Sequence, residues 1–292
     1  MTRLGIFVLW LLHWLPLPVL AVIGRTLGRL LPVAVPHRRR VVQTNLRLCF
    51  PDMDEAGRNA LMREHFALLG RSLLERNLLW WASAERLQRI SRVEGLDNLA
   101  LANRRAPGRP MILVVPHFIG LDICGTTLAL SMDAVSMYAA QKNAAIDALL
   151  LHGRSRFGNQ HLLTRQDGIR GTVKALRELR PFFYLPDMDY GPRDAVFVPF
   201  FGVQAATIAG VSRLATLTGA SVHTCVTEIL PGGQGYVSRI GPAWESFPSD
   251  DAVADTARMN ALIEQEILKM PAQYYWVHKR FKTRPEGETG FY

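Results

Sequence analysis

The segment Met111–Asp122 limits the possible folds of this chain more than any other part of the sequence. An apolar run reaches Pro116, a histidine follows at position 117, and a carboxylate comes five residues later at position 122. On a continuous helix these two side chains would point about 140° apart and could not meet. We therefore expect His117 in the loop after a buried strand and Asp122 in the first turn of the next helix.

That arrangement would allow the two side chains to act together. The carboxylate of Asp122 would accept a hydrogen bond from one ring nitrogen of His117 and leave the other nitrogen free as a general base. Such a pair suits the deprotonation of a hydroxyl that then attacks an activated carbonyl. The simpler alternative is a histidine that caps the helix, with the acid placed favourably for the helix dipole. The spacing by itself favours neither interpretation.

The first 51 residues differ in composition from the rest of the chain. They contain seven arginines and no Asp or Glu, so they carry +7 of the net charge of +9 and the other 241 residues carry +2. The 20 residues Leu4–Ile23 have no charge, which is about the length that crosses a hydrocarbon core. A cleaved secretory signal has a shorter apolar stretch after a basic region. We therefore expect residues 1–23 to be a retained membrane-anchoring helix, which either spans the membrane or forms a re-entrant hairpin at Pro16 and Pro18.

The basic stretch that follows the anchor indicates where the protein acts. Residues 24–52 form a basic juxtamembrane segment, and Arg25 to Arg40 should lie on the cytoplasmic side against anionic lipid or a phosphorylated substrate. Nucleic acid is the alternative partner, but no nucleic-acid module accompanies the arginines. We therefore expect anionic membrane lipids and no nucleic acid among the partners.

The remaining residues, 53–292, predict one globular domain of the α/β class. No linker, repeat or low-complexity tract divides them. Strands and helices are expected to alternate, which is typical of a mixed, largely parallel sheet flanked by helices. The expected helices cover residues 53–81, 121–130, 144–156, 168–180, 207–218 and 251–269. The expected strands cover residues 111–115, 181–185, 196–201 and 221–229.

Several other side chains lie where such a fold places a site, at the ends of strands. Asp187 and Asp189 follow an apolar strand and could order the pocket, bind an acceptor sugar or hold an arginine, although an ordinary acidic turn is the simpler interpretation. Arg154 and Arg156 could bind phosphate through their planar forks. As residues on the surface of a helix, such arginines usually have no ligand.

Two aromatic segments have a structural and a functional interpretation. Phe197–Gly202 is more typical of a core than of a groove for an acyl chain. The basic segment Trp276–Arg284 either contacts phosphate or an acidic protein, or is a solvated end. The three cysteines lack metal-like spacing, and the sequence has no nucleotide-binding or zinc motif. We expect neither a metal nor a cofactor.

Taken together, these blocks resemble the late acyltransferases of lipid A biosynthesis, the lauroyl and myristoyl transferase group within the lysophospholipid acyltransferase superfamily. The resemblance covers nearly the whole chain and keeps the order of the family's blocks. Those blocks are Asn45–Pro51, His117–Asp122, Gly153–Arg156, Asp187–Gly191, Val196–Gly202 and Tyr275–Lys282. Asp122 stands where many members have Glu.

The resemblance implies a glycerolipid acyltransferase-like fold and an enzyme on the cytoplasmic face of the bacterial inner membrane. Such an enzyme moves an acyl chain from acyl carrier protein to a hydroxyl of a lipid A precursor. We expect His117 and Asp122 to be the catalytic pair, with the oxyanion held by backbone N–H groups near Gly120.

Arg154, Asp187 and Asp189 are expected to bind the acceptor. The length of the acyl chain and the acylated position stay open. The alternatives are an acyltransferase for an amino lipid or phospholipid, and a membrane scaffold without catalytic activity.

Overall fold

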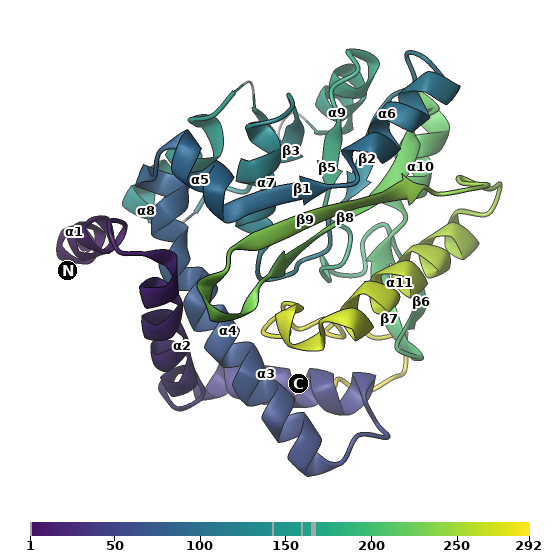
Figure 1. Cartoon of the computed structure of the whole chain (residues 1–292). Helices are drawn as coiled ribbons and strands as arrows, with labels where there is room; N and C mark the ends of the chain where they lie inside the picture. The colour runs from purple at the N-terminus through teal and green to yellow at the C-terminus, as the bar shows by residue number, and fades with distance from the viewer. Residues whose placement is uncertain (1, 142, 159, 165–167) are drawn as a thin grey trace.

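The computed structural model describes residues 2–141, 143–158, 160–164 and 168–292 (Figure 1). The helices are α1 (Thr2–Leu12), α2 (Leu17–Ala34), α3 (Pro36–Cys49), α4 (Glu55–Trp81), α5 (Ala84–Ile90), α6 (Leu96–Arg105), α7 (Leu121–Ala129), α8 (Ala144–Ser155), α9 (Gly168–Arg177), α10 (Gly210–Thr218) and α11 (Ala252–Lys269), with short 3-10 turns η1 (Pro231–Gly233) and η2 (Pro271–Gln273). The strands are β1 (Ser91–Glu94), β2 (Met111–Val114), β3 (Val135–Met137), β4 (His161–Leu163), β5 (Phe182–Tyr184), β6 (Ala195–Phe200), β7 (Val203–Ile208), β8 (Ser221–Ile229) and β9 (Tyr236–Ala243).

A central sheet organises the described part of the chain. Its seven strands follow the order β1-β9-β8-β2-β5-β3-β4. Neighbouring strands run parallel except β8 and β9, which are antiparallel. β6 and β7 form a separate antiparallel hairpin beside α11 (Figure 1). The structure therefore confirms the expected α/β class with a mixed, largely parallel sheet flanked by helices.

The two faces of the sheet bury different side chains, because successive residues of a strand point to opposite faces. One face packs against α6 and α7, in a cluster that includes Leu99, Leu113, Cys124, Leu128 and Phe183. The opposite face belongs to a larger core that extends to α9, α10, α11 and the N-terminal helices, with members such as Ile112, Phe182, Leu176, Leu214 and Ile263. β2 and β5 are thus covered on both sides.

The long helix α4 connects the N-terminal helices to the sheet. The side chain of Asp54 caps its first turn. Halfway along, Arg71 and Glu75 form a fully buried ion pair at 2.7 Å, and Glu75 also accepts a hydrogen bond from the hydroxyl of Tyr236 on β9. Removing either charge would leave the other buried without its partner and would lower the free energy of unfolding by about 3–5 kcal/mol. The pair therefore fixes α4 against the sheet.

The uncharged N-terminal segment forms two helices rather than one. α1 ends at Leu12 and α2 begins directly after Pro16, the residue whose ring predicts a break. α2 then continues to Ala34, so the boundary expected between residues 23 and 24 lies inside a helix. Within the described residues, α2 is the helix long and apolar enough to cross a membrane, with a mean hydropathy of 1.4 over 18 residues.

One face of α2 packs closely along α4. A Cβ atom on Gly28 would lie 2.3 Å from the carbonyl oxygen of Phe66, and one on Gly70 would lie 2.3 Å from the Cα atom of Gly28. Glycine is therefore required where the two backbones meet. The other face is apolar and exposed: the exposed fraction of the surface is 67% for Val22 and 61% for Leu30. An exposed apolar face of this kind marks a surface for a membrane or a partner.

The β6–β7 hairpin accounts for one error in the predicted elements. The helix expected over residues 207–218 begins only at Gly210, because Val203–Ile208 form β7. The preceding segment, Phe197–Gly202, contributes two buried residues to the core, Val198 and Phe200, and the guanidinium of Arg280 lies 4.9 Å from the ring centroid of Phe200. Pro199 and Gly202 are exposed. The core interpretation therefore holds for Val198 and Phe200.

Candidate active site

The loop between β2 and α7 holds His117 where the sequence predicts it. The C-terminal segment braces this loop. The N–H of Tyr275 donates to the carbonyl of His117 at 2.9 Å, and the N–H of Ile119 donates to the carbonyl of Gln273 at 2.8 Å. The position of the histidine therefore depends on a segment more than 150 residues further along the chain.

Asp187 is the carboxylate that contacts the imidazole. Its Oδ1 atom lies 2.7 Å from Nδ1 of His117, and its Oδ2 atom accepts from the backbone N–H of the same residue at 2.9 Å. The topology explains this contact. β2 and β5 are parallel neighbours in which Val114 pairs with Tyr184. His117 and Asp187 each come three residues later, so they leave the same edge of the sheet side by side.

The contact determines which ring nitrogen of His117 can act as a base. An ionised carboxylate can only accept, so Nδ1 carries the proton and Nε2 has its lone pair free. Burial opposes ionisation of Asp187, but the charge and hydrogen bonds of His117 and a hydrogen bond from Tyr274 outweigh it and lower the pKa of Asp187 to about 2. The side chain of His117 keeps 14% of its surface exposed, so solvent or substrate can reach the ring.

Asp122 does not make the contact expected of it. It lies in the first turn of α7 as predicted, but its two oxygens face Nε of Arg76 at 2.8 Å and Nη2 of Arg154 at 3.1 Å. The physical reason is that α7 directs this side chain towards α4 and α8, while β5 brings Asp187 to the imidazole. Burial raises the pKa of Asp122, but the charges of Arg76, Arg154 and His117 and the hydrogen bond from Arg154 together lower it below its usual value. Asp122 remains near enough to act on His117 through its charge.

The two aspartates expected to bind an acceptor are both buried. The side chain of Asp187 is fully enclosed and engages His117. Asp189 accepts from the N–H of Thr283 at 2.6 Å, from its hydroxyl at 2.8 Å and from the N–H of Gly191 at 2.9 Å, while its own N–H donates to Nε2 of His278. These contacts hold the C-terminal segment in place. Direct contact of either carboxylate with an acceptor is therefore not supported.

The two arginines of α8 differ in their surroundings. Arg154 leaves 35% of its side chain exposed, and its guanidinium lies 5.5 Å from the ring centroid of Tyr138. It can therefore still receive a ligand beside Asp122. Arg156 instead donates to the carbonyls of Trp80 and Ala82 at the end of α4. Two donors of Arg156 thus satisfy carbonyls at the end of a helix, which leaves less of its guanidinium for a phosphate than Arg154 offers.

Gly120 is the residue that directly precedes α7. A Cβ atom there would approach both the side chain and the carbonyl oxygen of Thr227 on β8 to 3.1 Å. Within the described part of the chain, the N–H of Gly120 makes no hydrogen bond. The position therefore suits a small residue with an unused backbone donor.

Arg76 and Tyr274 belong to the site but were not expected there. Arg76 lies within α4, where nothing in the local sequence separates it from the other charged residues of the helix. Tyr274 contributes to the lowered pKa of Asp187. Tyr274 directly precedes the last block of the family resemblance, which is the signal that could have led to it.

A narrow apolar cavity of about 60 Å³ opens beside Asp122 and Arg154. Leu121 of α7, Phe183 of β5 and Leu185 contribute to its apolar wall. The site therefore combines a histidine whose Nε2 is free, a charged cluster and an apolar recess at the carboxyl ends of β2 and β5. Clefts at this edge of a parallel sheet are where α/β proteins bind ligands.

Comparison with known proteins identifies the family. Residues 1–283 match the family model described as bacterial lipid A biosynthesis acyltransferase. The chain belongs to this family. The lipid A biosynthesis lauroyltransferase of Escherichia coli is 38% identical over 98% of this chain and 93% of its own length. The palmitoleoyltransferase of the same organism is 35% identical over 100% of this chain and 94% of its own length. The myristoyltransferase of that organism is 32% identical over 93% of this chain and 82% of its own length. The protein is therefore an acyltransferase of lipid A biosynthesis, as the sequence blocks predicted.

Proposed function

We propose that this family member transfers a fatty acyl chain from the thioester of acyl carrier protein to a hydroxyl of a lipid A precursor. The single observation that carries the mechanism is the contact between Nδ1 of His117 and Asp187, which leaves Nε2 as the base. The names of the relatives support an acceptor of the lipid A type.

The chemical steps follow from this geometry. Nε2 of His117 takes the proton of the acceptor hydroxyl while the oxygen attacks the carbonyl carbon of the thioester. Asp187 stabilises the imidazolium that forms. The unused N–H of Gly120 is proposed to donate to the tetrahedral oxyanion. When the intermediate collapses, the C–S bond breaks and the departing thiolate takes the proton from His117.

The charged cluster and the apolar recess are proposed to hold the substrates. Arg76 and Arg154 keep about a third of their side chains exposed while they flank Asp122. Guanidinium groups bind phosphate well, so this pair suits a phosphate of the acceptor. The recess beside Phe183 and Leu185 suits the acyl chain, and at about 60 Å³ it must widen when the chain enters.

Membrane attachment is proposed to occur through the N-terminal helices. The exposed apolar face of α2 and the exposed Phe7 and Leu11 of α1 would enter the bilayer of the bacterial inner membrane. The basic residues that follow would contact anionic lipids and place the catalytic domain on the cytoplasmic face. Arg25 is already engaged, because it forms a bidentate pair with Glu64 at 2.7 Å. We propose no role for nucleic acid.

Mass spectrometry of lipid A tests this function. Lipid A would be extracted from a strain that lacks the gene and from the same strain with wild-type protein or with His117→Ala. We expect the lipid A of the deletion strain to lack one acyl chain. Wild-type protein should restore that chain, and His117→Ala should not restore it at an equal protein level. An unchanged lipid A in the deletion strain, together with an altered phospholipid or amino lipid, would assign the enzyme to another acceptor.

A further inference from the structure

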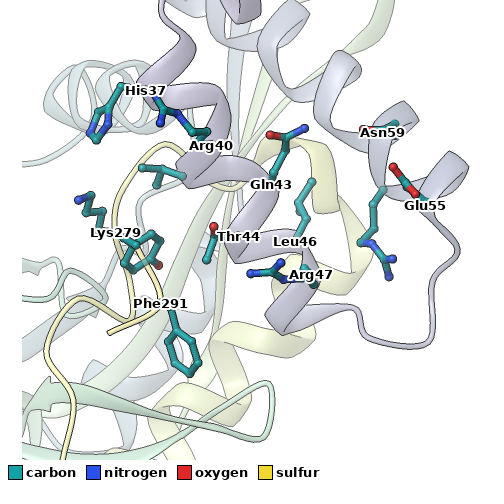
Figure 2. Close-up of a pocket in the computed structure, with 13 residues that line it drawn as sticks. His37, Arg40, Gln43, Thr44, Leu46, Arg47, Glu55, Asn59, Lys279 and Phe291 are labelled. Atoms are coloured by element: carbon teal, nitrogen blue, oxygen red, sulfur yellow. The ribbon is translucent and has the colours of Figure 1, made fainter. Parts of the chain in front are cut away.

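A second concavity, of about 600 Å³, lies between α3 and the C-terminal segment (Figure 2). Neither His117 nor Asp122 lines it, so it is separate from the candidate active site. We call it the α3 recess. The residues that matter for its chemistry are His37, Arg40, Thr44, Arg47, Lys279 and Phe291.

The sequence of α3 directs His37, Arg40 and Arg47 into the recess. Positions 37, 40, 44 and 47 are three or four residues apart, so their side chains share one face of the helix (Figure 2). A different face of α3 is buried and carries Val42, Asn45 and Cys49. Asn45 donates from Nδ2 to the carbonyls of Trp276 and His278, both at 2.7 Å. The orientation of Arg40 and Arg47 is thus fixed by packing on the other side of the helix.

Three cations of the recess have no acidic partner. Among the described residues, no Asp or Glu forms an ion pair with Arg40, Arg47 or Lys279, and neither arginine donates a hydrogen bond within the protein. Glu55 is the acidic residue of the lining and lies at the far rim (Figure 2).

The neighbouring arginine Arg58 is different, because its guanidinium donates to the carbonyls of Phe50, Pro51 and Met53. Its donors stabilise the loop before α4. Arg40, Arg47 and Lys279 therefore remain free to bind an anion.

The place of the recess in the fold indicates where that anion comes from. α3 begins at Pro36, one residue after Val35, at the end of the exposed apolar face of α2, where Val33 is 80% exposed. Phe291 adds an apolar wall, and the ring of Tyr292 lies 5.4 Å from Nζ of Lys279. A cationic hollow beside an apolar surface matches a molecule with a charged head and apolar chains.

We propose that the α3 recess binds the phosphate group of an anionic lipid, with Arg40, Arg47 and Lys279 as the donors. The two planar forks suit phosphate oxygens better than ammonium groups alone would. A concavity of about 600 Å³ suits a phosphate head, whereas an acidic protein would dock across a broad, flat surface. The orientation of the recess towards lipid rests on the membrane attachment proposed above, but binding can be measured apart from acyl transfer.

Calorimetric titration of the full chain in a non-ionic detergent tests the proposal. The probes are dioctanoyl phosphatidic acid, dioctanoyl phosphatidylcholine, inorganic phosphate and holo acyl carrier protein. We expect phosphatidic acid to bind more tightly than inorganic phosphate, because the chains add apolar contact, and more tightly than the zwitterionic lipid. Arg47→Ala and Arg40→Ala should each weaken this binding at least about tenfold, the value of one charge-assisted hydrogen bond.

Arg39→Ala is the matched control, because Arg39 is an exposed arginine of α3 that does not line the recess, and a detergent solution contains no bilayer surface for it to contact. It should retain wild-type affinity, and equal melting temperatures will show that all variants are folded. An equal loss in Arg39→Ala would overturn the proposal, as would equal affinity for inorganic phosphate and phosphatidic acid. Loss of carrier protein binding in Arg47→Ala, with lipid binding retained, would assign the recess to protein docking instead. Acyl transfer by the wild-type protein is measured in a separate assay. If the wild-type protein shows no transfer, the proposed function is contradicted, but the lipid-binding result for the α3 recess stands.

Discussion

The carboxylate of Asp187 accepts hydrogen bonds from both the backbone N–H and Nδ1 of His117, at 2.9 and 2.7 Å. Two contacts from one carboxylate fix the ring orientation and its tautomer together. Asp122, in the same family block as the histidine, forms ion pairs with Arg76 and Arg154 instead. The two acids should therefore respond differently to substitution.

Asp187→Asn should lower kcat about a hundredfold or more, because an amide cannot stabilise the imidazolium. Steady-state transfer with purified enzyme, carrier thioester and lipid A precursor measures this loss. Asp122→Asn is the comparison and should retain more of kcat. A larger loss of kcat in Asp122→Asn, at unchanged melting temperature, would make Asp122 the functional partner of His117.

Arg154→Lys should raise KM for the acceptor, because an ammonium keeps the charge but loses the planar fork. Slow hydrolysis of the donor thioester by water should persist, since this residue does not touch His117. Arg177→Lys on α9 is the control and should change neither activity. Equal loss of transfer and hydrolysis in Arg154→Lys would instead point to carrier docking or to the transition state.

Glutamate at exposed apolar positions of α2 should weaken membrane attachment without unfolding the protein. Val22→Glu with Leu30→Glu places two charges on the face that packs against nothing in the described structure. Vesicle flotation should show less bound protein, and the remainder should fall further with added salt, because surface charge is screened. Leu268→Glu, at an exposed position on α11, is the control, and the same fraction of this variant as of wild type should float with the vesicles. Unchanged flotation of the α2 variant would show that this face is not the attachment.

Acidification should destabilise the protein through His65. This ring is fully buried, and its Nδ1 donates to the carbonyl of Ala272 at 3.0 Å while Nε2 has no hydrogen-bond partner among the described residues. Burial lowers the pKa of His65 to about 4, so the unfolded state binds a proton first as pH falls below about 6.5 and the folded state loses stability down to about pH 4.

His65→Asn is the variant that tests this, because the asparagine amide can keep the contact with Ala272 but does not titrate. Melting temperatures at pH 7.5 and pH 5 should therefore differ less in the variant than in wild type. An equal difference in both proteins would show that another group causes the acid sensitivity.

Local patterns predicted the elements around the site well. The apolar run that ends at Pro116 indicated a strand, and the spacing of His117 and Asp122 indicated the loop and helix that follow. Short strands were missed, such as Val135–Met137 and His161–Leu163, because three residues carry too little periodicity to be recognised.

The partner of His117 could not be predicted in the same way. Asp187 lies 70 residues further along the chain, and its contact depends on β5 being the neighbour of β2. No sequence pattern states the order of strands in a sheet. His117 and Asp187 each follow the paired strand residues Val114 and Tyr184 by three positions. This equal spacing predicts their contact only when β2 and β5 are known to be neighbours.

The glycine contact between α2 and α4 has a consequence for how the enzyme meets its substrates. With Gly28 and Gly70 in backbone contact, α2 packs directly on α4 and is not an anchor joined only by a tether. α4 also carries Arg76, which holds Asp122. With the membrane attachment proposed above, the depth to which α2 enters the bilayer would set the height of the active site above the lipid headgroups. A membrane-borne acceptor would then reach His117 at a fixed distance from the surface.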